Sequence, residues 1–382
     1  MAKPARPPTR VLLGIGGGIA AYKAAELARM VELSRQGMID GAVGSYFSDH
    51  FTRQLKAASM VQDYLGLCPK PSKRIEGGGA TGGLCFQSAW EAVSSGRMNV
   101  CLAFGFETMS RVNTWKGNEF IALASDTNFD FPVGGFYTGY YAMMVQRHMH
   151  EFGTTSEQLA EIAVSTRSWA AMNPSARYRE PITVDDVLAS PMIAAPLHKL
   201  DCCLVTDGAG ALVMTKADRA RDLRRDPIYV LGAGTSHTHA MSISQMPDLT
   251  VTAGAVSGPK AFAMAGITAT DVDVLETYDS FTITVLLALE DLGFCAKGEG
   301  GAFVAGGRLG PGGELPTNTN GGGLSYTHPG MYGMFVLVEA VRQLRGGLAD
   351  RQVPGAKVAV AHGCGGVLSS TSTVVLGTEE TL

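Results

Sequence analysis

Three predicted strand or loop ends in the second half of the sequence carry side chains that exchange protons or hold an anionic oxygen. The run VDVLE leads into TYDSFT, the run NTNGGGLSYTHPG precedes a predicted helix, and the run VAVA leads into HGCGG. The candidate residues are Tyr278 and Asp279, Tyr326 and His328, and His362 and Cys364. Because open α/β sheets bind ligands at the carboxyl ends of their strands, we expect these segments to form one site.

The two histidines suit proton transfer or oxyanion binding. His328 lies just before a predicted helix, whose positive N-terminal end favours a neutral imidazole that accepts a proton or donates to a carbonyl oxygen. His362 precedes the run GCGG, where the backbone approaches a ligand closely and offers free N–H groups to an oxyanion. On the residues alone, a capping or packing role remains open for each histidine.

The elements that position these residues follow an α/β pattern, in which short apolar runs end in glycine and lead into amphipathic stretches. Strands are predicted over residues 10–13, 98–105, 210–215, 228–232, 272–277, 358–361 and 370–376. Helices are predicted from the first glycine turn through residue 33 and over 84–95, 159–172, 259–266, 280–292 and 331–344. An aromatic loop is expected over 129–141, and a glycine turn over 363–366. The charge-dense run 216–226 divides the chain into an N-terminal half, 1–225, with a loop subdomain at about 110–195, and a C-terminal half, 226–382.

Composition excludes several classes of function. The chain has 382 residues with a formal net charge of −4, so neither nucleic acid nor an anionic membrane surface is an expected partner. No run of about 18 apolar residues predicts a membrane span. Seven cysteines without a CxxC pair are typical of a reduced, cytoplasmic protein, and we expect no metal site in this chain. His148 with His150 and His237 with His239 are i, i+2 pairs that lack a third ligand.

Five stretches together resemble the thiolase superfamily. They cover residues 82–111 (GGLCFQSAWEAVSSGRMNVCLAFGFETMSR), 186–215, 276–282 (ETYDSFT), 318–346 and 362–370 (HGCGGVLSS). The chain is most similar to the sterol-carrier and archaeal-type thiolases, which work beside a small zinc-containing OB-fold (DUF35-type) subunit. The resemblance implies two similar halves in a five-layered α-β-α-β-α fold. It also implies active sites at a homodimer interface and coenzyme A thioesters as substrates.

The resemblance fails at the nucleophile. Thiolases carry a reactive cysteine at the turn before the first-half helix, whereas this chain reads EGGGATGG over 76–83 and has Gly79 at that position. Cys85 follows six residues later, within the predicted helix, where a small buried core residue is expected. Cys85 could serve as the nucleophile only after a shift in register.

The resemblance assigns roles to the remaining candidates. His328 matches the histidine of the HP motif that helps form the thioester oxyanion hole, and His362 falls where thiolases have their second, acid/base cysteine. The backbone N–H groups of Gly79 and Cys364 match the second oxyanion hole, and Tyr326 is a further substrate-binding candidate. Tyr278 stands where classical thiolases have Asn or His.

Without a thiolate there is no acyl-enzyme, so we expect retro-aldol cleavage of a β-hydroxyacyl-CoA, with Tyr278 or His362 as the base. A thiolase-like aldolase branch of steroid side-chain degradation also lacks the cysteine and uses tyrosines, although His328 departs from that branch. Two alternatives stay open. One is a β-ketoacyl-CoA thiolase that uses Cys85 or direct attack by CoA, and the other is a non-catalytic acyl-CoA or lipid-binding subunit.

The first apolar run, VLLGIGGGIAAYKAAELARM, is similar to the FMN-binding start of phosphopantothenoylcysteine decarboxylases. The likeness covers only about twenty residues, and the run breaks the dinucleotide pattern GxGxxG at its third glycine. No other flavin segment follows, so we do not expect FMN.

Overall fold

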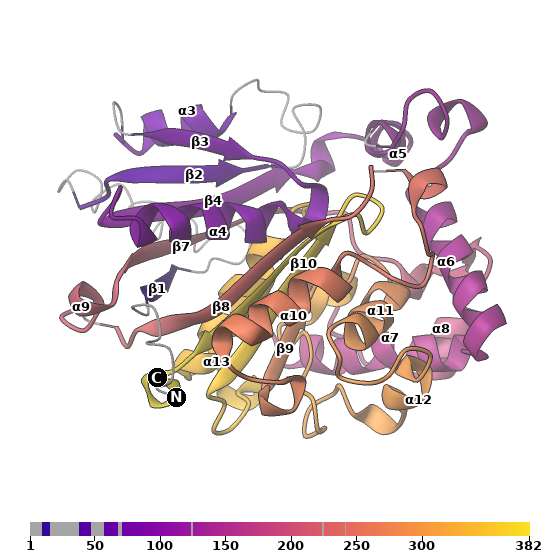
Figure 1. Cartoon of the computed structure of the whole chain (residues 1–382). Coiled ribbons are helices and arrows are strands. Elements are labelled where there is room, and N and C mark those ends of the chain that lie inside the picture. Colours follow the sequence, from indigo (N-terminus) through magenta and orange to yellow (C-terminus); the bar gives the residue numbers. More distant parts are fainter. Residues whose placement is uncertain are drawn as a thin grey trace, which may run out of the picture.

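The computed structural model describes residues 10–15, 38–46, 57–67, 71–123, 125–223, 225–240 and 242–382 (Figure 1). The strands are β1 (Arg10–Ile15), β2 (Gly41–Ser45), β3 (Ser72–Ile75), β4 (Val100–Thr108), β5 (Met192–Ala194), β6 (Leu197–His198), β7 (Asp207–Lys216), β8 (Ile228–His237), β9 (Val274–Thr277), β10 (Val358–Gly365) and β11 (Ser370–Gly377). The helices are α3 (Ala57–Tyr64), α4 (Thr81–Ser94), α5 (Thr114–Ala122), α6 (Tyr137–Phe152), α7 (Ser156–Ala171), α8 (Val184–Ala189), α9 (Ala217–Ala220), α10 (Gly254–Ala265), α11 (Thr282–Asp291), α12 (Gly300–Phe303) and α13 (Gly333–Arg345).

Nine of the described strands form one sheet in the order β3-β2-β4-β7-β1-β8-β11-β10-β9. Strand β1 joins the two halves because it pairs antiparallel with both β7 and β8. Helix α3 packs on β2 and β3, helices α4 and α13 lie between the two halves of the sheet, and α10 covers β8 and β11 (Figure 1). This packing of helices on the two halves of the sheet confirms the expected α/β fold with α-β-α-β-α layers.

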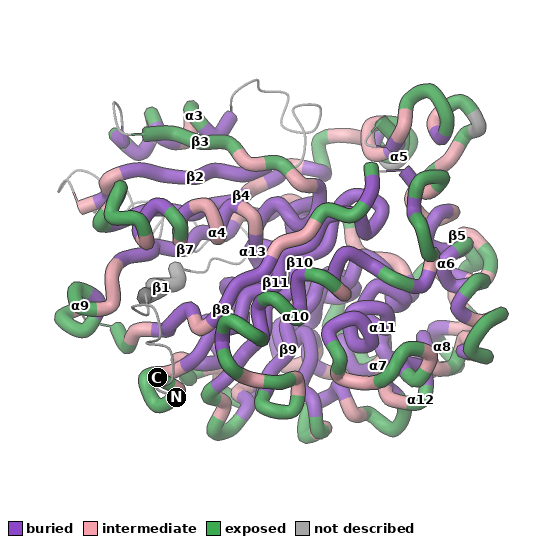
Figure 2. Tube along the Cα trace, in the orientation of Figure 1, coloured by how far each residue is buried: buried purple, intermediate pink, exposed green. Residues whose placement is uncertain are grey.

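The central layer explains why α13 is buried on nearly every side. Its apolar residues recur at helical spacing, and the helix packs against α4 as well as β9 and β10. Every residue of β9, β10 and β11 is also buried, as the purple centre of Figure 2 shows. The strand ends that carry the candidate residues are therefore held on a rigid core.

Most predicted elements are confirmed within a few residues, and three expectations need correction. Strand β10 continues through Gly365, so residues 363–365 are strand and not turn. Helix α6 begins at Tyr137, inside the expected loop, because tyrosines of its first turns pack into the core. Helix α10 begins five residues early and holds Pro259 in its interior.

Two further expectations concern the ends of the first half. The helix predicted through residue 33 and most of the flavin-like run lie outside the described residues. The boundary at 225/226 stays a prediction. Over the ranges that the structure covers, no helix is long and apolar enough to cross a membrane.

Candidate active site

The turn before α4 and the end of β10 meet backbone to backbone. A Cβ atom on Gly365 would lie 2.6 Å from the Gly79 nitrogen and 2.7 Å from the Ala80 nitrogen. Gly78 has a φ of +57°, and a Cβ there would lie 2.6 Å from the Gly366 nitrogen. Only glycines permit this close approach. Two segments nearly 300 residues apart in the sequence are thus held together at the site.

Tyr278, which directly follows β9, lies over this junction. A Cβ atom on Gly79 would be 2.6 Å from both Cε2 and Cζ of the Tyr278 ring, and closer still to the carbonyl oxygen of Cys364. The backbone N–H of Tyr278 donates to the His362 carbonyl at 2.8 Å, which fixes the tyrosine beside β10. Burial raises the pKa of Tyr278 well above its usual range, so its hydroxyl keeps its proton at neutral pH.

Tyr278 and His328 form a hydrogen-bonded pair. The Tyr278 hydroxyl lies 2.8 Å from Nε2 of His328 and 3.2 Å from the Gly330 carbonyl oxygen. Burial lowers the pKa of His328 to about 4, so the imidazole is neutral at pH 7 and able to accept a proton. Its Nδ1 is buried and has no hydrogen-bond partner in the part of the chain that the structure describes.

Asp279 holds the glycine-rich loop that leads to His328. One carboxylate oxygen accepts from the Gly323 N–H at 2.6 Å, and the other accepts from the Leu324 N–H at 3.2 Å. Burial raises the pKa of Asp279 to about 7, although these backbone donors oppose the rise. Asp279 is therefore a positioning group in this structure.

His362 is the fourth polar group. Its Nδ1 lies 2.9 Å from the Thr373 hydroxyl, and burial lowers its pKa to about 4. On the other side of the ring, a Cβ atom on Gly254 would lie 3.4 Å from Nε2. A glycine at the start of α10 therefore leaves space next to Nε2.

Two predicted residues lie outside this constellation. The Tyr326 ring packs edge-on against Phe335 at 6.2 Å, and Phe335 stacks on Tyr332, whose ring lies 5.8 Å from that of Tyr278. Cys85 has no exposed surface, and its thiol lies 2.9 Å from the Val43 carbonyl oxygen, which accepts from it. Burial raises the pKa of Cys85, which disfavours the thiolate.

Tyr141 of α6 adds a second tyrosine to this region. Its ring lies 4.3 Å from that of Phe281, three residues after Tyr278. Beyond the effect of burial, Tyr141 raises the pKa of Tyr278, and Cys364 raises the pKa of both tyrosines. Tyr141 belongs to the aromatic run 129–141, which the sequence predicted to be a loop.

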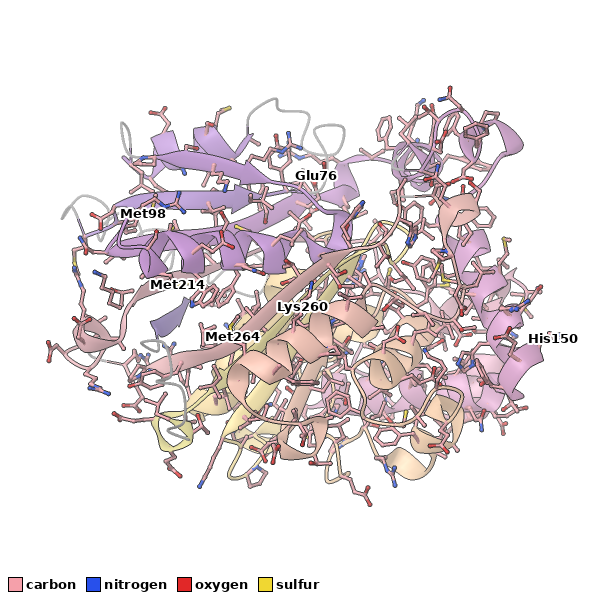
Figure 3. The ribbon with its side chains drawn as sticks, viewed as in Figure 1. Glu76, Met98, His150, Met214, Lys260 and Met264 are labelled. Atoms are coloured by element: carbon pink, nitrogen blue, oxygen red, sulfur yellow. The ribbon has the colours of Figure 1, made fainter. Side chains whose placement is uncertain are left out.

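The two histidines of the pair His148 and His150 lie in different environments. Helix α6 carries both His148 and His150, and positions i and i+2 of a helix face different directions. His148 is buried between Thr154 and Glu290, whereas His150 lies on the outer edge of α6 (Figure 3). Within the described ranges, no three His, Cys, Asp or Glu side chains gather as metal ligands would.

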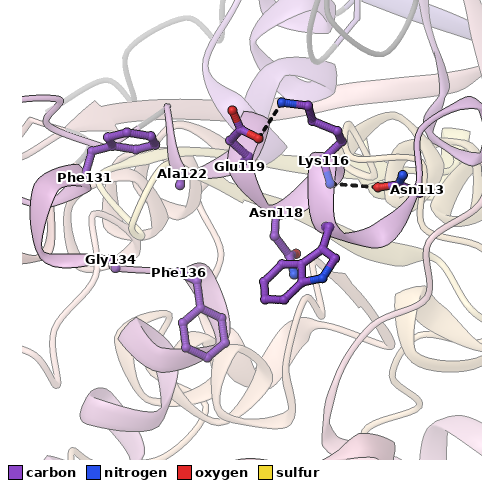
Figure 4. Close-up of a pocket in the computed structure, with 10 residues that line it drawn as sticks. Asn113, Lys116, Asn118, Glu119, Ala122, Phe131, Gly134 and Phe136 are labelled. Atoms are coloured by element: carbon purple, nitrogen blue, oxygen red, sulfur yellow. Dashed lines mark hydrogen bonds and ion pairs between the residues drawn. The ribbon is translucent and has the colours of Figure 1, made fainter.

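A separate cavity of about 450 Å³ opens between α5 and residues 131–136 (Figure 4). Trp115, Phe131 and Phe136 provide its aromatic lining, and a Lys116–Glu119 ion pair of 2.7 Å lies beside them. Trp115 is 87% exposed, which is unusual for a side chain of its size. None of the predicted site residues lines this cavity.

Comparison with known proteins gives two family matches. The family model described as "Thiolase, N-terminal domain" matches residues 38–218, and that described as "Thiolase C-terminal domain-like" matches residues 234–378.

Individual relatives cover most of the chain. An acetyl-CoA acetyltransferase of Methanothermobacter thermautotrophicus is 39% identical over 85% of this chain and 84% of its own length. A 17-hydroxy-3-oxo-4-pregnene-20-carboxyl-CoA lyase of Mycobacterium tuberculosis is 36% identical over 80% of this chain and 81% of its own length. Among solved structures, the Ltp2-ChsH2(DUF35) aldolase aligns with a TM-score of 0.81 and 30% identity, covering 99% of this chain and 100% of that one.

Proposed function

We propose, from the premise that this chain belongs to the thiolase family, that it cleaves a β-hydroxyacyl-CoA by a retro-aldol reaction without a covalent acyl-enzyme. The products are a ketone or aldehyde and a shortened acyl-CoA. Its relatives include both an acetyltransferase and a lyase that act on CoA thioesters, so relatedness alone supports either reaction. The arrangement of the site favours the lyase.

One observation carries the proposal: Gly79 stands where thiolases have their nucleophilic cysteine, and the Tyr278 ring fills the space beside it. With 2.6 Å between a Cβ at position 79 and the ring, a cysteine does not fit while Tyr278 keeps its position. Burial also raises the pKa of the Cys364 and Cys85 thiols. Neither of these two thiols is therefore available as a thiolate to carry an acyl group.

The Tyr278–His328 pair supplies the base. The proton of the substrate β-hydroxyl passes to the Tyr278 oxygen as Tyr278 gives its own proton to Nε2 of His328, 2.8 Å away. This relay requires the neutral His328 ring to carry its proton on Nδ1, and the nearby Leu204 backbone favours the ring once it is doubly protonated. The electron pair of the O–H bond forms the carbonyl, and the electron pair of the broken Cα–Cβ bond becomes the thioester enolate. The same proton then returns through Tyr278 to Cα, so the reaction consumes no co-substrate.

The enolate needs hydrogen-bond donors where its charge develops. We assign this task to the backbone N–H groups of Gly79 and Cys364 and to the imidazole of His362. The backbone groups belong to the junction at which the α4 turn contacts the end of β10, and the imidazole comes from the same strand and lies between Thr373 and Gly254. Tyr326, three ring contacts away from Tyr278, supports the wall of the site and does not touch the reacting atoms in this proposal.

The remaining assignments follow from family membership. We propose coenzyme A as the thioester carrier, with no metal bound by this chain, and a homodimer located in the cytoplasm. The structural neighbour's name includes a DUF35 component, which supports a small partner subunit of that type for this chain. A zinc ion in that partner remains a proposal from the resemblance.

The function is tested with two substrates, each with the protein alone and with the candidate partner subunit. A β-hydroxyacyl-CoA is supplied without free CoA, and a β-ketoacyl-CoA is supplied with it. Release of a ketone or aldehyde from the first supports the proposal. CoA-dependent cleavage of the second alone would establish a thiolase, and binding without turnover of either would establish a non-catalytic acyl-CoA-binding subunit.

A further inference from the structure

Three buried hydroxyl groups line up behind His362. Thr371 and Thr373 lie on the same face of β11, two residues apart, and Ser257 lies on the inner side of α10, which packs on that strand. The outer side of α10 carries Lys260 and Met264 instead (Figure 3). All three hydroxyl-bearing residues are fully buried.

The three hydroxyls form a continuous chain of hydrogen bonds that ends on the imidazole. The Thr371 hydroxyl donates to the Ser257 oxygen at 2.8 Å. The Ser257 and Thr373 oxygens are 2.8 Å apart, and the Thr373 oxygen is 2.9 Å from Nδ1 of His362. The chain therefore has three links and three hydroxyl protons.

Counting the hydroxyl protons shows in which direction the hydrogen bonds of this hydroxyl chain run. Because Thr371 already donates to Ser257, the Ser257 proton finds its acceptor in the Thr373 oxygen. The Thr373 proton then has Nδ1 of His362 as its acceptor. Each hydroxyl donates once, and every link is satisfied.

The opposite direction leaves a proton without a partner. If Nδ1 of His362 carried hydrogen and donated to Thr373, then Thr373 would donate to Ser257. Ser257 would receive two protons, and its own would face no acceptor among the residues described. The first direction leaves only the Nε2 proton of His362 without a partner among the described residues, whereas the opposite one leaves both the buried Ser257 proton and the Nε2 lone pair unpaired, so the opposite direction is disfavoured.

The far nitrogen of the ring, Nε2, lies next to Gly254 at the start of α10. His362 is neutral at pH 7, so when Nδ1 accepts, Nε2 carries the single ring proton. Nε2 has no hydrogen-bond partner in the described ranges, and the missing side chain of Gly254 leaves room next to it. A neutral imidazole in this state donates through Nε2 and does not accept a proton there.

We infer that the Thr371–Ser257–Thr373 hydroxyl chain fixes His362 as a hydrogen-bond donor through Nε2, aimed at the enolate oxygen of the substrate thioester. Thr373 and Ser257 are then positioning residues, and the choice of base falls on Tyr278. The target of the donated bond rests on the proposed retro-aldol function. The direction of the hydrogen bonds in the hydroxyl chain rests on this structure alone.

The tautomer is measured directly by nitrogen NMR of the substrate-free protein, labelled with ¹⁵N-histidine, at pH 7.5. The His362 signals are assigned by their loss in His362→Asn. We expect Nδ1 of His362 to resonate as an unprotonated imidazole nitrogen and Nε2 as a protonated one. Protonated Nδ1 would overturn the inference whether or not the protein cleaves any substrate. The predicted tautomer together with no retro-aldol activity would leave the hydroxyl chain intact and refute the proposed function only.

Kinetics test the positioning residues. Thr373→Val removes the hydroxyl that donates to Nδ1, and we expect kcat for β-hydroxyacyl-CoA cleavage to fall about tenfold, the equivalent of one lost hydrogen bond, with KM nearly unchanged. Thr373→Ser keeps the hydroxyl and should restore kcat and the wild-type tautomer. Thr215→Val, at a buried threonine of β7 whose hydroxyl donates to the Asn99 carbonyl, is the matched control. Equal kcat in Thr373→Val and Thr215→Val, or no rescue by serine, would overturn the inference.

Discussion

The phenol ring of Tyr278 occupies the volume that a side chain at position 79 would need. The 2.6 Å between an ideal Cβ on Gly79 and two ring carbons is well below any stable contact between carbon atoms. The two positions therefore constrain each other, since a tyrosine at 278 requires a glycine at 79.

This constraint predicts a coupling in stability. Gly79→Ala should lower the free energy of unfolding by about 1–3 kcal/mol, as overpacked cores do. In a Tyr278→Ala background the same change should cost less, although the Cys364 carbonyl oxygen still crowds position 79. Urea unfolding of the wild type, the two single variants and the double variant measures the coupling. An equal cost in both backgrounds would show that the ring does not exclude the side chain.

Removing the Tyr278 hydroxyl should abolish most turnover. Tyr278→Phe keeps the ring over Gly79 but loses the group that lies 2.8 Å from His328, so kcat should fall by roughly 10²- to 10⁴-fold while substrate binding persists. Tyr326→Phe is the matched control because its ring packs against Phe335, away from Tyr278. Steady-state kinetics of both variants provide the comparison. A similar loss in both would assign the effect to packing.

The buried histidines predict a loss of stability in acid. His328 and His362 each have a pKa of about 4 in the folded chain against 6.5 when unfolded, so the unfolded state binds their protons first as the pH falls. Between pH 6.5 and 4, each should lower the free energy of unfolding by about 1.4 kcal/mol per pH unit. Asp279 acts in the opposite direction, because its pKa of about 7 makes the folded state bind a proton more readily.

Urea titrations at several pH values test this dependence. In His328→Gln, the free energy of unfolding should fall less steeply between pH 6.5 and 4.5 than in the wild type, because the contribution of His328 to the slope is lost. His150→Gln, on the outer side of α6, controls for the loss of an imidazole elsewhere. Identical slopes in the two variants would contradict the neutral, buried state of His328.

Cys85→Ala separates the proposed lyase from a thiolase that uses this cysteine. The thiol contacts the Val43 carbonyl inside the core, so the substitution should affect stability modestly and leave kcat within about twofold of the wild type. Near-complete loss of kcat in a variant that still unfolds cooperatively would identify Cys85 as the nucleophile.

Sequence periodicity predicted the elements whose burial is regular. Helix α13 has apolar residues at helical spacing, and strands β9 and β11 each contain two or three consecutive apolar residues, so their patterns identify them. The meeting of Tyr278 and His328 follows from the rule that strand ends in an α/β sheet gather at one edge.

What the sequence could not predict depends on tertiary contacts. The start of α6 lies in an aromatic and glycine-rich run of low helical propensity, and burial of its tyrosines decides the helix. The extension of β10 through Gly365 depends on the backbone of residues 77–80 lying against it. The bond between Thr373 and His362 arises from the pairing of β10 with β11, and no spacing in the sequence marks Ser257 as its neighbour.

The most direct test of cleavage without an acyl-enzyme is the mass spectrum of the acyl-CoA formed from a β-hydroxyacyl-CoA in D₂O with no free CoA. The proton that leaves the β-hydroxyl returns to Cα through Tyr278, so we predict a shortened acyl-CoA that carries one deuterium at Cα. Absence of any shortened acyl-CoA from this substrate, together with its formation from a β-ketoacyl-CoA and free CoA, would contradict the account, because a thiolase cleaves the β-keto compound and not the β-hydroxy compound.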